Sequence, residues 1–376
     1  MRVTQYGKAP LGVWGLLVFC FFINPSFAQV SGGQSAFEYL RLPNAPHVSA
    51  LGGISVANPD NDIAFALQNP ALMRPGMHNE LQLVYNSYYA AIAVMNLQYG
   101  YHDAKLNTSF FFGMQYLNYG GFDQTNNVGN ITGEFHASDY AATLGASRSY
   151  MEHWRYGVAV KWAGSSLGEY KAAAALADVG VNYYDTASLW DVGIVAKNMG
   201  VMVKKYDASN TAEPMPFDLQ IGASKKFKHL PLRLLATVHH LYEWDIRYAN
   251  PADLAGTNSL GTNDTVKDKG SHFGDKLFRH FILGAELTLA KRLTVSFSYN
   301  DMRRREMALQ TNPATAGFAF GAGLDLKKLQ IHYARSYYSV AGAYNEFSLT
   351  LALNKLFGLN QVGEKIHWNA EYPDWE

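Results

Sequence analysis

Apolar and polar residues alternate along many stretches of this chain. Residues 293–300, Leu-Thr-Val-Ser-Phe-Ser-Tyr-Asn, alternate without exception, and residues 154–162, 217–224 and 347–354 follow the same pattern. Successive side chains of a β-strand point to opposite faces, so the pattern predicts strands with one apolar and one small polar face. The runs reach about nine to twelve residues, longer than the five or six of ordinary soluble strands and suited to a tilted strand that crosses a membrane.

The pattern predicts about fourteen strands, an even number as expected for a bacterial membrane barrel. Aromatic residues gather near the predicted strand ends, where rings with a polar edge prefer the boundary between membrane and water. The strands are predicted near residues 79–88, 91–102, 106–118, 136–149, 153–164, 168–184, 188–199, 215–227, 232–245, 278–290, 292–303, 315–326, 328–339 and 343–355.

The connections between these strands differ in length in a regular way. Those after even-numbered strands are short, and several after odd-numbered strands are long, at 119–135, 200–214, 245–277 and 304–314. Short turns on one side and long loops on the other are typical of outer-membrane barrels. A soluble β-sandwich, the alternative fold, has no reason to sort its loops in this way. We therefore predict an all-β transmembrane antiparallel β-barrel over residues 79–355, with both termini, the short turns and a C-terminal tail (356–376) in the periplasm.

The first 28 residues predict export. Arg2 and Lys8 precede an apolar run from Leu11 to Ile23, and small residues at Ser26 and Ala28 complete a secretory signal peptide. The run is too short to span a bilayer as a helix, although a retained anchor is the alternative. We expect a mature chain that begins near Gln29.

Composition narrows the class of function further. Charged residues are 16% of the chain, against a usual quarter, and the net charge is +0, which argues against a nucleic-acid partner. The single cysteine, Cys20, lies in the predicted signal peptide, so the mature chain has no disulfide and no thiolate ligand. No mature stretch is apolar enough for a membrane-spanning helix.

Residues 29–78 do not alternate and contain several prolines and the pair Gly52-Gly53, which break any long element. A fourteen-stranded barrel needs filling, since eight strands already close around a packed interior. We therefore predict that this segment is a plug, or hatch, inside the barrel. A disordered periplasmic leader is the alternative.

At these residues the chain resembles known families. Residues 63–72, with the triplet Asn69-Pro70-Ala71, resemble the hatch motif of the FadL-type transporter superfamily. Residues 32–43, the stretch from Ala50 to Gly53 and the C-terminal part of the chain are similar to the PorQ family, barrel components of the bacterial type IX secretion system. The resemblance marks Gly52, Gly53 and the triplet as hatch residues.

The resemblance implies a non-enzymatic outer-membrane protein without a cofactor. It would anchor a PorZ-like surface protein, beside PorU and PorV, in a complex that processes cargo and attaches it to lipopolysaccharide. The alternative is a FadL-type transporter of a hydrophobic solute, which would need an apolar tunnel from the outer loops to Asn69. The expected lumen-facing positions are polar, which favours the anchor; they are Asn96, Gln98, Gln115, Asp178, Asn182, Asp191, Lys197, Gln220, Ser296, Ser298, Glu346, Ser348 and Thr350.

Other candidate chemistry is weak, and we predict no catalytic triad and no metal site. His239 and His240 are expected to point to opposite faces of one strand, so that they cannot share a metal. The stretch Asp60-Asn61-Asp62 could bind Ca²⁺ or simply form turns. Three arginines, Arg303, Arg304 and Arg305, are expected at the outer end of a strand, either as an interfacial basic cluster or in contact with lipopolysaccharide phosphates.

Overall fold

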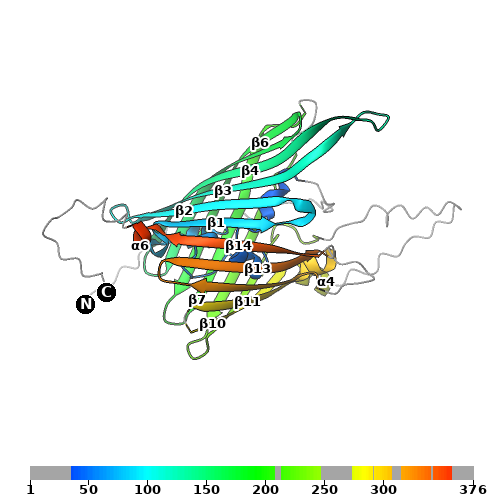
Figure 1. Ribbon diagram of the computed structural model, residues 1–376. Coiled ribbons are helices and arrows are strands. Elements are labelled where there is room, and N and C mark those ends of the chain that lie inside the picture. The colour runs from blue at the N-terminus through cyan, green and yellow to red at the C-terminus, as the bar shows by residue number, and fades with distance from the viewer. Residues whose placement is uncertain are drawn as a thin grey trace, which may run out of the picture.

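Fourteen antiparallel strands close into a barrel in the computed structural model, which describes residues 35–207, 213–246, 273–290, 292–306, 315–339 and 342–357. Each strand pairs with its neighbour in sequence, and β1 pairs with β14 (Figure 1). The predicted fold class is confirmed. The predicted signal peptide, most of the C-terminal tail and most of the loop 245–277 lie outside the described residues.

All fourteen strands lie close to the predicted positions. They are β1 Glu80–Ser87, β2 Ala93–Asp103, β3 Thr108–Thr125, β4 Ile131–Tyr150, β5 Trp154–Leu167, β6 Tyr170–Asp185, β7 Trp190–Lys204, β8 Asp218–Lys226, β9 Leu232–Val238, β10 Phe281–Leu289, β11 Leu293–Asn300, β12 Phe318–Asp325, β13 Leu329–Ser339 and β14 Gly342–Ala352.

Several predicted boundaries are wrong, and three of these differences have a clear local reason. The expected loop 119–135 is mostly a paired hairpin, because a bulge at Gly120, with φ of 85°, lets the β3–β4 ladder continue. Strand β9 ends at Val238 rather than at 245, and two residues later the left-handed φ of 55° at His240 turns the backbone away from the extended conformation. Residues Asp301–Glu306 form helix α5, which the Asn300 side chain caps by accepting a bond from the Arg303 amide at 3.2 Å.

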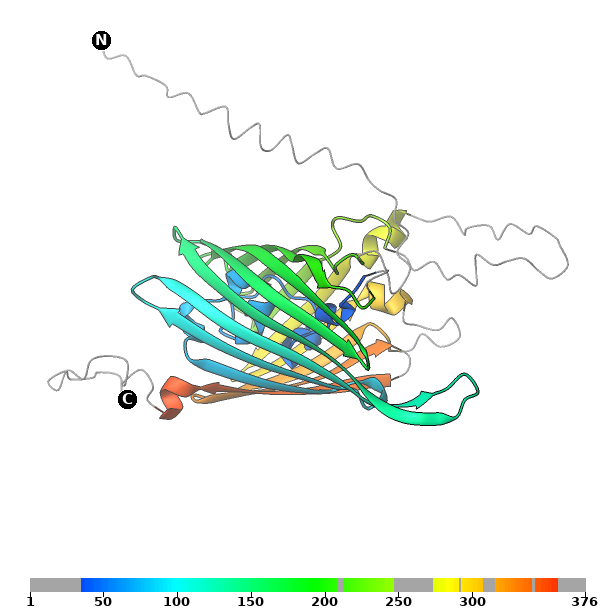
Figure 2. The same ribbon diagram turned by 90° about the horizontal axis from the view of Figure 1, so that it is seen from above.

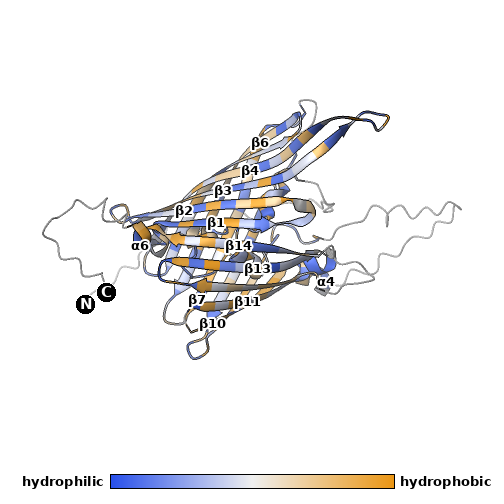
Figure 3. Cartoon of the chain, viewed as in Figure 1, coloured by the Kyte–Doolittle hydropathy of each residue, from blue (hydrophilic) through white to orange (hydrophobic). Residues whose placement is uncertain are grey.

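The outer surface of the wall is an apolar belt. On β5, Tyr156, Val158 and Val160 are exposed, whereas the alternating residues Ala159 and Lys161 are buried. The same alternation recurs around the ring, and orange and blue residues follow one another along the strands in Figure 3. Among the described residues, no helix is long and apolar enough to cross a membrane.

The wall has two heights. Strands β3 to β7 contain 14 to 20 residues, whereas β8 to β14 contain 7 to 11. The β3–β4 hairpin therefore projects beyond its neighbours (Figure 1). We call β3 to β7 the tall wall. Two short helices, α4 (Phe273–Arg279) and α5, contact each other at the long-loop end, while α6 (Leu353–Phe357) follows β14 at the short-turn end.

Residues 35–78, which we call the plug, lie inside the ring of strands (Figure 2). Helix α2 (Pro46–Ala50) packs on β11 to β14, and η3 (Pro70–Leu72) packs on β4 to β6. Helices η2 (Ile63–Leu67) and η4 (Pro75–Met77) contact β1 and β2, on the remaining side. The other short helices are η1 (Glu38–Arg41), at the start of the plug, and η5 (Tyr89–Ala91), between β1 and β2. The plug contains short helical turns rather than long helices, as we predicted from its prolines.

The direction of the plug differs from the prediction. We expected the residues before the barrel at the periplasmic, short-turn end. Instead, the amide of Ala36 donates to the carbonyl of Pro214 in a long loop. The plug then runs through the barrel to the short-turn end, where the Asn79 amide donates to the carbonyl of Gly100. The cause is hydrophobic burial of the first residues of the plug.

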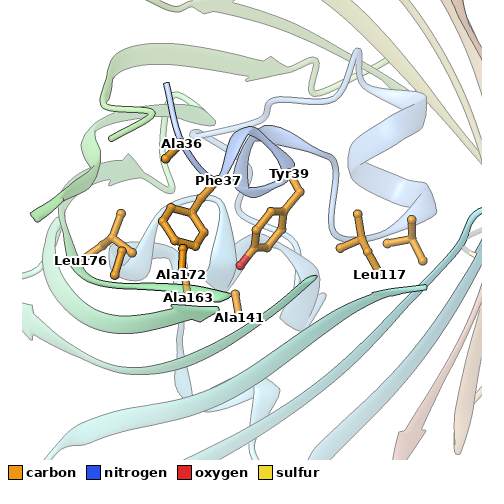
Figure 4. Packing of buried hydrophobic residues seen from close by; sticks show 10 residues of the cluster. Ala36, Phe37, Tyr39, Leu117, Ala141, Ala163, Ala172 and Leu176 are labelled. Atoms are coloured by element: carbon orange, nitrogen blue, oxygen red, sulfur yellow. The ribbon is translucent and has the colours of Figure 1, made fainter. Parts of the chain in front are cut away.

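Figure 4 shows the contacts that hold this first part. Phe37 and Tyr39 are buried against small residues of the tall wall, among them Ala141, Ala163 and Ala172. The Tyr39 hydroxyl also donates to the carbonyl of Tyr140 at 2.6 Å. Large plug rings thus fill the space that small wall residues leave, which is how close packing is reached in protein interiors.

Candidate functional site

Asn69 is fully buried where the plug meets the wall. Its side-chain oxygen accepts from the Ala71 amide at 3.0 Å and caps η3, while its amide group donates to the carbonyl of Val56 at 3.1 Å. Pro70 occupies the first position of η3, where its fixed φ suits a helix start. The predicted hatch motif therefore joins two plug turns, and its effect on hatch geometry stays a prediction.

A row of wall glycines makes room for this motif. Gly157 pairs with Gly180 across β5 and β6, and Gly193 pairs with Gly222 across β7 and β8. A Cβ at Gly157 would collide with the backbone of Pro70, and one at Gly180 with the Asn69 side chain. The wall thus approaches the plug more closely than any residue with a side chain permits.

The predicted hatch glycines are also in tight positions. Gly52 and Gly53 have φ of 94° and 91°, which favours glycine. A Cβ at Gly52 would collide with Ile282, and one at Gly53 with the guanidinium of Arg303. The Gly52 carbonyl accepts from the Asn300 side chain at 3.2 Å. The turn after α2 is therefore fitted to β10, β11 and α5.

A cluster of buried charged side chains joins the plug to the opposite side of the wall. His47 of α2 bonds through Nδ1 to Asp62 at 2.8 Å and through Nε2 to Glu286 on β10 at 2.6 Å. His332 on β13 lies 3.3 Å from the same Asp62 carboxylate. We call His47, Asp62, Arg233, Glu286 and His332 the plug seat.

Arg233 on β9 completes the plug seat. Its guanidinium donates to both oxygens of Asp60, at 2.5 and 2.7 Å, and to Glu286 at 2.9 Å. It also donates to the side-chain oxygen of Asn58 at 2.9 Å. Such bidentate, charge-assisted bonds are both strong and directional, so the plug seat fixes one orientation of the plug within the barrel.

Burial and pairing oppose one another in setting the charges of the plug residues. Burial by itself lowers the pKa of His47, but the hydrogen bonds with Asp62 and Glu286 outweigh it and raise that pKa well above its ordinary value. Burial would raise the pKa of Asp62, yet the bonds from His332 and His47 hold it well below its usual range. The pair is therefore an imidazolium beside a carboxylate at neutral pH.

The plug seat also bears on the predicted calcium alternative. The carboxylates of Asp60 and Asp62 are bound by Arg233 and His47 respectively, so the two acids do not converge on one cation. Asp62 in addition accepts from the Ala64 amide at 3.0 Å and caps η2.

Above the plug, at the long-loop end, lies a cavity of about 770 Å³. We call it the upper cavity. Its upper rim carries apolar side chains such as Leu42, Ile92 and Tyr119. The lining also includes Gln68, next to Asn69, and Lys197, whose ammonium donates to the carbonyl of Leu67 at 3.1 Å. The volume is that of a small-molecule pocket, and the lining next to the hatch motif is mixed, with apolar Leu67 beside polar Gln68.

The three predicted arginines do not act together. Arg303 is buried, with its guanidinium 4.1 Å from the centroid of the Tyr338 ring and in contact with Gly53. Arg304 is half-buried. Arg305 is exposed and forms ion pairs with Asp301, at 2.7 Å, and with Asp275. Contact with lipopolysaccharide phosphates stays a prediction for Arg304 and Arg305, whereas Arg303 faces the plug.

The expectation that His239 and His240 point to opposite faces is wrong. Strand β9 ends before them, and the positive φ of His240 turns its ring towards His239. Their Nδ1 atoms lie 2.5 Å apart. Side-chain parity holds only while the backbone stays extended.

The plug seat was not predicted from the sequence, although one signal for it was present. Arg233 and Glu286 stand directly opposite each other on β9 and β10, so a charged pair at lumen-facing positions of two adjacent predicted strands was visible. Nothing in the sequence pattern marked His47 or His332 as its partners. The predicted polar lumen positions are placed correctly, since nearly all of them are buried inside the barrel.

No family model and no curated protein matches this chain. Its backbone fold is similar to that of TodX, a toluene transporter of Pseudomonas putida. The two sequences are 12% identical, and the structures match with a TM-score of 0.45 over 86% of this chain and 98% of TodX. It is also similar to the monoaromatic hydrocarbon channel CymD, with 12% sequence identity and a TM-score of 0.48 over 84% of this chain and 97% of CymD. A third similar structure is a FadL homologue of Pseudomonas aeruginosa, with 10% sequence identity and a TM-score of 0.43 over 82% of this chain and 97% of that homologue. These likenesses leave the function of the chain open.

Proposed function

We propose that this protein is a non-enzymatic outer-membrane component of the type IX secretion attachment complex, and that it anchors a PorZ-like surface protein beside PorU and PorV. The observation that carries the proposal is the fixed plug. The plug seat and the contacts of Asn69 lie between the upper cavity and the short-turn end. Because buried ion pairs fix the plug across the barrel lumen, the barrel is suited to holding a partner rather than to passing a solute.

The apolar belt supports a membrane location, because a closed barrel leaves no unpaired strand edge in lipid. With the long loops outside the cell, as in outer-membrane barrels, the tall wall extends from the membrane on the outer side. The tip of its β3–β4 hairpin exposes the apolar side chains of Val128 and Ile131, at 84% and 67%. Exposed apolar groups beyond the belt suit contact with a surface protein.

The test shortens this hairpin. Replacing residues 122–133 by a two-residue turn should release the PorZ-like protein from the cell surface, while the barrel still shifts its electrophoretic mobility on heating. Val128→Ser combined with Ile131→Ser should weaken retention without altering the backbone. Val201→Ser combined with Val203→Ser, at exposed positions of β7, is the matched control. Full retention after shortening would overturn the proposed role of the hairpin.

A second candidate function, a FadL-type transporter of a hydrophobic solute, is favoured by the upper cavity. Its volume of about 770 Å³ suits a small molecule. Reconstituted vesicles distinguish the two functions. An anchor should give no uptake of an apolar solute above that of protein-free vesicles. Saturable uptake, together with undisturbed surface retention in the shortened variant, would replace the first proposal by the second.

A further inference from the structure

At the end of β9, two histidine rings face each other inside the protein. The ring centroids of His239 and His240 are 4.8 Å apart with an angle of 75° between the planes, and the two Nδ1 atoms are separated by 2.5 Å. The second nitrogen of His239, Nε2, has no hydrogen-bond partner among the described residues. The contact with His240 is therefore the polar interaction that orients the His239 ring.

A carboxylate stands beside this pair. Asp218, the first residue of β8, accepts from the His240 amide through Oδ1 at 2.7 Å. Its other oxygen, Oδ2, lies 3.8 Å from His240 Nδ1 and accepts from the Gln220 side chain at 2.7 Å. One donor atom from each of Asp218, His239 and His240 lies within 4.8 Å of the others. The three side chains thus converge, and Gln220 holds the carboxylate in place.

We propose that Asp218, His239 and His240 bind one divalent transition-metal ion of the Zn²⁺ class. Two imidazole nitrogens and one carboxylate oxygen are ligands that Zn²⁺ accepts in a tetrahedral site with one open position. His240 lines the upper cavity, so water from that cavity fills the fourth position. Without an ion, the two imidazole lone pairs and the carboxylate would be buried with few protons available for hydrogen bonds between them. Burying such groups without partners costs free energy.

The burial and the charges around the site agree with this proposal. All three side chains are buried, and the two histidines bind an ion in their neutral form. Positive groups also face the site. Arg41 acts on His240 and Arg303 acts on His239, and the ring centroid of His280 lies 6.3 Å from that of His239. These positive groups weaken the binding of a cation, so we expect micromolar rather than nanomolar affinity.

The other two buried clusters of metal-binding residue types contain His47. Both ring nitrogens of His47 are already bonded to carboxylates, so its protonated ring has no lone pair to offer. The end of β9 is therefore the place in the described structure where neutral histidines meet.

Titration of the metal-free protein in detergent with Zn²⁺, followed by calorimetry, tests the proposal. Wild type should bind one equivalent. His240→Ala and His239→Ala should each weaken binding at least tenfold, and Gln220→Leu, which frees the Asp218 carboxylate, should weaken it about 10- to 100-fold. His229→Ala, at an exposed position in a short turn, is the matched control and should bind as wild type does.

Co²⁺ provides a second measurement that does not depend on a variant folding. In wild type it should produce the visible absorption bands of a four-coordinate site, and Zn²⁺ should displace it. The proposal is overturned if wild type binds less than one equivalent, if bound Co²⁺ gives only the weak spectrum of a six-coordinate surface ion, or if folded His240→Ala binds as tightly as wild type.

Discussion

The two ends of the plug are held by different physical means. Residues 36–42 at the long-loop end pack rings and aliphatic side chains against small residues of the tall wall. Residues 44–78, towards the short-turn end, also pack apolar side chains against the wall, and they are held in addition by the plug seat and by the bonds of Asn69. Apolar packing is not directional, whereas buried ion pairs require one geometry. The plug seat therefore fixes the orientation of the lower part, whereas the upper part depends mainly on apolar packing.

The largest expected effect comes from the plug seat. His47→Ala leaves the carboxylates of Asp62 and Glu286 buried with one partner fewer, at a cost of about 3–5 kcal/mol to the attachment of the plug. We expect rapid hydrogen exchange of backbone amides 60–78 while the barrel strands stay protected. His229→Ala, at an exposed histidine, is the control. Unchanged protection of residues 60–78 would show that the plug seat does not hold the plug.

A smaller effect is expected at the other end. Phe37→Ala removes a buried ring next to Ala163 and Ala172, at a cost of about 3 kcal/mol. Because this packing is separate from the plug seat, residues 35–42 should become sensitive to protease added to intact cells, while residues 60–78 remain protected. Loosening of both parts at once would contradict the distinction between the two ends.

The hatch motif should have a more moderate effect. Asn69→Ala combined with Pro70→Ala removes the cap of η3 and leaves the Val56 carbonyl without its donor, at about 2 kcal/mol. Faster proteolysis of residues 44–68 from the periplasmic side should follow, while the barrel remains heat-modifiable. Gly180→Ala, whose Cβ would meet Asn69 from the wall, should have a similar effect. Unchanged proteolysis in both variants would show that the hatch motif does not help to hold the plug in the barrel.

The smallest effect is a dependence on pH. The pKa of His47 is raised, so its contribution to stability is complete below its ordinary value of about 6.5 and is lost as pH rises through the higher value in the folded protein. The pKa of Asp62 is lowered, so its contribution is complete above about 4 and is lost only as pH falls through the lower folded value.

Exchange of amides 60–78 should therefore be steady between about pH 4 and 6.5 after correction for intrinsic rates. Between about pH 6.5 and the higher folded pKa of His47, the protection should fall by up to about 1.4 kcal/mol per pH unit, and it should level off above that pKa. His47→Gln, which does not titrate, should abolish this alkaline slope. A slope that survives in His47→Gln would assign the pH dependence to another group.

The sequence alone determined the wall. Strict alternation and the sorting of short and long connections gave fourteen strands and their order, because each strand pairs with its sequence neighbour and its two faces meet lipid and lumen. The Asn69-Pro70 turn was also within reach of sequence reasoning, since capping and proline geometry are local properties.

Only the tertiary structure decided what happens inside the wall. His47, Glu286 and His332 are brought together from α2, β10 and β13, and no local pattern encodes a contact between residues that lie more than two hundred positions apart. The same holds for Phe37, whose burial against the tall wall reverses the expected direction of the plug. The pairing of His239 with His240 depended on a single backbone angle at the end of β9, where alternation ceases to fix the direction of a side chain.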